Sequence, residues 1–114
     1  MFKISLSDRY TWTVSVEVIG DGGKATKHTF EAQFRRLSQS EIDAMIAGLQ
    51  SKEIGDAQVI EQVLVGWKGI QDAGGQEIHF GETTRDQVLD VYPVRPAVLQ
   101  AWFESLQGAK RKNS

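Results

Sequence analysis

Two stretches near the start of the chain alternate strictly between hydrophobic and polar residues. The first covers residues 10–18 and the second covers residues 28–34, and both are rich in β-branched and aromatic side chains. A period of two is typical of strands that bury one face. The glycine-rich residues 20–23 (GDGG) between them suit a tight turn, because glycine accepts a positive φ. The pattern predicts an antiparallel hairpin, or a sheet of three strands if the alternating residues 2–6 join it.

Helical spacing replaces this alternation from residue 38 onward. Ser38 and Glu41 form a capping-box pattern before an apolar set at helical spacing, and this first helix should end before Gly55. Asp56 is placed to cap a second helix. The second helix should bury a wide apolar stripe, which comprises Val59, Ile60, Val63, Leu64 and Trp67.

The sequence pattern in the last third of the chain predicts a loop and two more helices. Residues 70–81 contain two adjacent glycines and indicate a loop, and Thr83 or Thr84 can cap a short helix after it. Pro96 suits the first turn of a last helix, which Gly108 is placed to end. The fold class is therefore α+β, with an N-terminal antiparallel hairpin or small sheet followed by about four α-helices. We expect a single domain over residues 1–108 and a short basic tail over residues 109–114.

Composition narrows the classes of function. The length of 114 residues suits one domain, and a net charge of −2 does not favour nucleic acid or an anionic membrane as a partner. The sequence has no cysteine, which excludes disulfides, thiolate metal sites and thiol nucleophiles. Neither the apolar core of a signal peptide nor an apolar run of membrane-spanning length is visible. We expect the protein to stay in the compartment where it is made.

The polar residues show no catalytic pattern. His28 and His79 lack a metal-ligand spacing, and Asp86 and Asp90 share a helix face as solvated carboxylates commonly do. The glycines of residues 20–23 precede a strand, whereas a phosphate-binding loop precedes a helix. We therefore expect no catalytic residue, no cofactor, no metal ion and no enzyme activity.

Five large apolar residues in the second and last predicted helices are candidates for binding a protein partner. Trp102 and Phe103 are adjacent, so they point about 100° apart on a helix, and the apolar stripe is wider than one contact face needs. Aromatic residues are enriched in protein interfaces. We expect one of these two residues to stay partly exposed in a single chain. The candidate partner-binding residues are Trp67, Leu99, Trp102, Phe103 and Leu106.

Several segments together resemble one protein family. They are FKIS at residues 2–5 before YTWTV, FRRLSQS at residues 34–40, VLVGWKGI at residues 63–70, PVRPA at residues 93–97, and the closing residues 103–113. On these segments the whole chain resembles the small tail assembly chaperones of long-tailed bacteriophages and prophages.

The resemblance implies a non-catalytic protein of the bacterial host cytoplasm. Such chaperones bind the tape measure protein, keep it soluble, help to recruit tail tube subunits and leave before the virion is complete. A protein that coats a long rod is also expected to self-associate or to bind in many copies. The two alternatives are a structural minor tail protein that is retained in the virion, and a small enzyme or regulator of another family.

The resemblance also implies a longer second product, made by a programmed −1 ribosomal frameshift near the end of the gene. Residues 111–113 (RKN) can be encoded as AGA AAA AAC, which contains a slippery sequence. The hypothesis requires these codons, so codons that break the run of adenines would contradict it.

Overall fold

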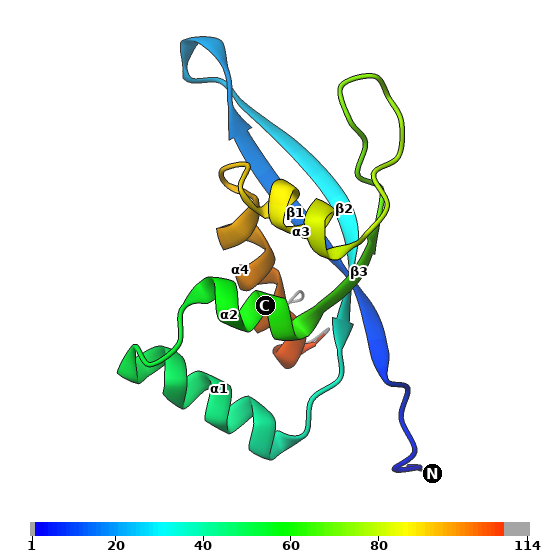
Figure 1. The fold of residues 1–114 in the computed structure, drawn as a ribbon, viewed down its shortest axis with the longest axis vertical. Coiled ribbons are helices and arrows are strands. Elements are labelled where there is room, and N and C mark those ends of the chain that lie inside the picture. The colour runs from blue at the N-terminus through cyan, green and yellow to red at the C-terminus, as the bar shows by residue number, and fades with distance from the viewer. Residues whose placement is uncertain (1, 109–114) are drawn as a thin grey trace.

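A long antiparallel hairpin lies at the centre of the fold in the computed structural model, which describes residues 2–108 (Figure 1). Strands β1 (Arg9–Ile19) and β2 (Ala25–Arg35) pair along their whole length. The short 3-10 turn η1 (Asp21–Gly23) joins them, and Gly22 and Gly23 there have positive φ, which glycine adopts without strain. The predicted hairpin is confirmed, including one buried and one solvent-exposed face.

The third strand comes from a segment that the sequence pattern assigns to a helix. Strand β3 (Leu64–Lys68) pairs antiparallel with β2, which gives the strand order β1-β2-β3. Residues 2–6 form no strand, so the prediction that they join the sheet is wrong. The predicted small antiparallel sheet itself, followed by helices in an α+β fold, is correct.

Helix α2 (Asp56–Val63) is therefore shorter than its predicted apolar stripe. Leu64 and Trp67 belong to β3, and the prediction of a helix through both residues is wrong. Gly66 explains part of the difference, since glycine disfavours a helix. A Cβ atom on Gly66 would lie 2.6 Å from Oε1 of Gln33, its partner on β2. The Gln33 side chain therefore lies over Gly66, and a side chain at position 66 would have to displace it.

Helix α1 (Gln39–Ser51) begins at the predicted capping box. The Ser38 hydroxyl oxygen accepts from the Glu41 amide at 3.2 Å, and Glu41 Oε1 accepts from the Ser38 amide at 2.9 Å. The hydrogen bond from the Ser38 amide is the main reason that the pKa of Glu41 lies below its usual value. The helix ends before Gly55, as predicted.

The remaining helix starts differ in detail from the sequence pattern. Asp56 lies in the first turn of α2, and Gly55 occupies the capping position, so the prediction that Asp56 caps the helix is wrong. Helix α3 (Glu82–Leu89) begins before both predicted threonine caps, and Thr84 instead donates to the carbonyls of His79 and Gly81. Helix α4 (Val94–Gln107) holds Pro96 in its first turn and ends at Gly108, as predicted.

One hydrophobic core joins the buried face of the sheet to α2 and α4, and the helices lie on that side of the sheet (Figure 1). The side chains that are almost fully buried include Val14, Phe34, Val59, Ile60, Val63, Leu64, Val98 and Trp102. The loop between β3 and α3 packs against the core at Trp67. Trp67 donates its indole N–H to the Ile78 carbonyl at 2.7 Å and packs edge-on against Phe80, with ring centroids 4.9 Å apart.

Candidate protein-binding surface

Helix α4 presents opposite faces to the core and to solvent. Val98, Ala101 and Trp102 on its inner face are buried. The outer face carries an apolar stripe at helical spacing, which we call the α4 stripe: Pro96, Leu99, Phe103 and Leu106. Phe103 and Leu106 expose 36% and 37% of their surface, although both are large hydrophobic residues. The expectation that one of Trp102 and Phe103 stays partly exposed is confirmed.

Trp102 and Phe103 differ in exposure because adjacent residues of a helix point in different directions. Trp102 has no exposed surface and lies among the core residues. The two rings stay in contact, with centroids 5.2 Å apart and planes tilted by 50°. Phe103 is thus supported from below by the core, while one side of its ring remains available to a partner.

A hydrogen-bond chain fixes which face of α4 points outward. The Ser105 hydroxyl donates to the Trp102 carbonyl at 2.6 Å, which uses its single hydrogen. The Tyr10 hydroxyl lies 2.6 Å from the same Ser105 oxygen, so Tyr10 must be the donor there. This contact joins α4 to β1, and it is supported on the strand side by the packing of Tyr10 against Phe34.

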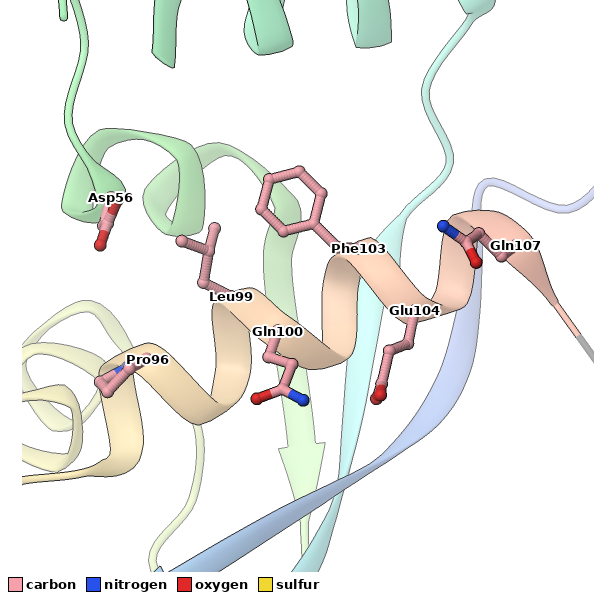
Figure 2. Close-up of a pocket in the computed structure, with 7 residues that line it drawn as sticks. All are labelled: Asp56, Pro96, Leu99, Gln100, Phe103, Glu104 and Gln107. Atoms are coloured by element: carbon pink, nitrogen blue, oxygen red, sulfur yellow. The ribbon is translucent and has the colours of Figure 1, made fainter. Parts of the chain in front are cut away.

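The α4 stripe borders a shallow hollow of about 300 Å³ (Figure 2). Leu99 and Phe103 point from α4 toward the side of α1 and α2, whereas Gln100 and Glu104 point away from them (Figure 2). The lining is mainly apolar, but it includes two acidic residues, Asp56 on α2 and Glu104 on the opposite side of the α4 stripe. An apolar strip with an acidic border fits an amphipathic helix that has basic residues beside its apolar stripe.

The structure divides the five candidate partner-binding residues into two groups. Leu99, Phe103 and Leu106 lie on the α4 stripe, where they have surface to offer. Trp67 and Trp102 are core residues, so they have almost no surface for a partner in this conformation. The apolar stripe of α2 is buried for the same reason, since Val59, Ile60 and Val63 all face the core.

The buried indole of Trp102 is notable for its missing hydrogen bond. Its Nε1 is the one buried side-chain nitrogen or oxygen in residues 2–108 without a partner. Such a group costs about 1–3 kcal/mol. We infer that Trp102 contributes to stability through the size of its ring system.

The polar residues considered in the sequence do not gather into a site. His28 and His79 are both exposed, and they lie on different elements. Across the described residues, no three His, Asp or Glu side chains lie close enough together to hold a metal ion. In the same part of the chain, no helix has both the length and the apolar character required to cross a bilayer.

Searches among protein-family models, curated proteins and solved structures give no match to this chain. A functional assignment therefore depends on the residues of the chain and on the surfaces of its fold.

Proposed function

We propose that this protein is a tail assembly chaperone of a long-tailed bacteriophage or prophage. It binds the tape measure protein, keeps it soluble during tail assembly and catalyses no reaction. The proposal is supported by the resemblance of the whole chain to this family and, in the structure, by the α4 stripe. The observation that carries most weight is the exposure of Phe103 and Leu106 on a helix whose inner face is packed into the core.

The proposed mechanism is the covering of apolar surface. A tape measure protein consists largely of long helices, and an uncovered apolar stripe on such a helix promotes aggregation. One of these helices would lie against the α4 stripe, with its own apolar residues on Leu99, Phe103 and Leu106. Because α4 is anchored to the core on its inner face, the surface needs little ordering when the partner binds.

The acidic rim adds a preference among helices. Asp56 and Glu104 border the hollow, so a helix with lysine or arginine beside its apolar stripe is favoured over one with acidic residues there. These carboxylates lie at the edge of the surface, and their effect should weaken as salt concentration rises.

Co-expression with the tape measure protein tests the proposal. The wild-type chain should increase the soluble fraction of the tape measure protein, and Phe103→Asp should remove most of that increase. Val91→Asp is a matched control, because Val91 is also an exposed hydrophobic residue but lies outside the α4 stripe. A tape measure protein whose solubility is indifferent to the wild-type chain would contradict the proposal.

The proposed function places the protein in the bacterial host cytoplasm and outside the mature virion. A structural tail protein would instead remain in the particle. Mass spectrometry of purified virions separates the two roles, since stoichiometric amounts of this chain in the particle would favour the structural role. Recruitment of tail tube subunits is part of the same proposal, and it predicts a complex that contains all three proteins.

A further inference from the structure

Residues 2–6 form an arm whose apolar side chains stay largely exposed within the described part of the chain, residues 2–108. Phe2, Ile4 and Leu6 expose 77%, 84% and 55% of their surface, and they alternate with Lys3 and Ser5. The arm leaves the sheet beside Arg36, whose side chain donates to the Ser7 carbonyl and whose amide donates to the Asp8 carbonyl. Three neighbouring hydrophobic side chains exposed in this way indicate a binding segment.

The outer edge of β1 offers unpaired backbone groups. Antiparallel pairs alternate between hydrogen-bonded and non-hydrogen-bonded positions. The bonds Arg36 N–H to Asp8 O and Gly20 N–H to Lys24 O, both 2.8 Å, show that the even-numbered residues of β1 bond to β2. The odd-numbered residues therefore direct their N–H and C=O groups away from β2, at the edge of the sheet.

A groove of about 460 Å³ runs along this edge, between β1 and α4. Its strand side is formed by Thr13, Ser15 and Glu17, which are three of the odd-numbered residues. Its helix side is formed by small or apolar residues and a few polar ones: Tyr92, Pro93, Pro96, Ala97, Gln100, Ala101 and Glu104. The groove thus combines a row of backbone donors and acceptors with a partly apolar wall, which is what an added strand requires.

We propose that the arm of a second copy of this chain occupies the groove as an additional antiparallel strand, and that two copies exchange arms reciprocally. One register pairs the outward-facing backbone groups of both strands and places opposite charges next to each other. In it, odd-numbered residues face odd-numbered residues: Lys3 faces Glu17, Ser5 faces Ser15 and Ser7 faces Thr13 of the other copy. The apolar residues of the arm then point toward the α4 wall, because they share the face of Val14 and Val16.

The arm cannot reach this groove in its own chain. Asp8 is held in the ladder with β2, so the arm would have to reverse direction within residues 2–7 and could lay down only a few residues. A second copy meets no such constraint. The reciprocal register brings the arm of each copy against the groove of the other copy. Residues near Tyr10 of the two strands lie at the two-fold axis, and Ser105 and Leu106 of α4 lie beside them. The exchange does not require the proposed chaperone function, although the groove shares Pro96, Gln100 and Glu104 with the hollow beside the α4 stripe.

Sedimentation velocity on the full chain tests the exchange. The wild type should approach twice the 12.7 kDa mass of one chain as concentration rises. Ile4→Asp should weaken the dimer at least tenfold, because it places a charge on the α4 wall. Phe103→Asp is the matched control and should leave the dimer intact, since Phe103 lies on the α4 stripe and lines neither the groove nor the pocket beside Tyr10. A wild type that stays monomeric at every concentration, or an Ile4→Asp variant with the wild-type mass, would overturn the proposal.

Introduced cysteines test the register, and the chain has none of its own. Facing residues of a hydrogen-bonded antiparallel pair have Cα atoms about 5.5 Å apart, within the range of a disulfide. A mixture of Ser5→Cys and Ser15→Cys chains should give a cross-linked heterodimer on mild oxidation. A mixture of Ser5→Cys and Thr29→Cys chains should not, because Thr29 lies on β2. Equal cross-linking of the two mixtures would overturn the register. Failure here leaves the solubility test of the tape measure protein unaffected, so the two proposals fail separately.

Discussion

The inner and outer faces of α4 are both apolar, yet they have opposite surroundings. Trp102 and its neighbours Val98 and Ala101 are enclosed by the sheet and α2, while Phe103, the next residue after Trp102, and Leu106 expose 36% and 37% of their surface. Residue type alone does not separate the two faces. The direction in which α4 meets β1 separates them, and the Tyr10–Ser105 contact helps to hold that direction. A hydrophobic residue in this helix is therefore buried or left available to a partner according to its position around the helix axis.

The largest expected effect is on the inner face. Trp102→Ala should lower the free energy of unfolding by about 3–5 kcal/mol, because it leaves a large cavity in the core. Urea unfolding followed by circular dichroism measures the change. A decrease in the free energy of unfolding below 1 kcal/mol would mean that Trp102 contributes little to the packing of the core.

Overfilling the inner face should have the next largest effect. Ala101 is 3% exposed and lies close to β1, so Ala101→Leu should cost about 1–3 kcal/mol through displaced neighbours. The control is Ala57→Leu, at an exposed position of α2, which should be nearly neutral. Similar costs for the two variants would contradict tight packing between α4 and the sheet.

Loosening the orientation of α4 should have a smaller effect. Tyr10→Phe removes the hydroxyl that donates to Ser105 and should cost about 1 kcal/mol. Tyr10→Phe should also weaken binding of the tape measure protein, since the α4 stripe loses a constraint on its direction. Ser105→Ala should give a similar change in stability, and the double variant should cost less than the sum of the two single changes.

Truncation on the outer face should affect stability no more than removal of the Tyr10 hydroxyl. Phe103→Ala should change the free energy of unfolding by only about 1 kcal/mol, because part of the ring is already in water and the core beneath it is unchanged. Its thermal unfolding should therefore stay close to that of the wild type. A loss as large as that of Trp102→Ala would place Phe103 in the core and remove the contrast between the faces.

Sequence patterns predicted the hairpin and the first helix well, because both depend on local signals. The alternation of residues 10–18 and the capping box of Ser38 and Glu41 act within a few residues. Strand β3 depends on a partner that lies about 30 residues earlier in the chain. Residues 63–67 suit both a helical stripe and a short buried strand, and the edge of β2 decides between them.

The candidate surface was predictable only in part. The adjacency of Trp102 and Phe103 indicated that one of them would be exposed, but the residue that faces the core is fixed by how α4 crosses β1. Trp67 was predicted to be buried on a helical stripe, and it is buried, but in strand β3. The groove beside β1 had no local signal at all, because it forms between two elements that are distant in the sequence.

The proposed function requires the α4 stripe to bind an apolar helix while the inner face of α4 holds the fold. Calorimetric titration with a helical segment of the tape measure protein measures this binding, using the wild type, Phe103→Asp and Val91→Asp. Binding with a negative heat-capacity change is expected for the wild type and for Val91→Asp, and at least tenfold weaker binding for a folded Phe103→Asp. Equal affinity of all three proteins for the segment would contradict this expectation.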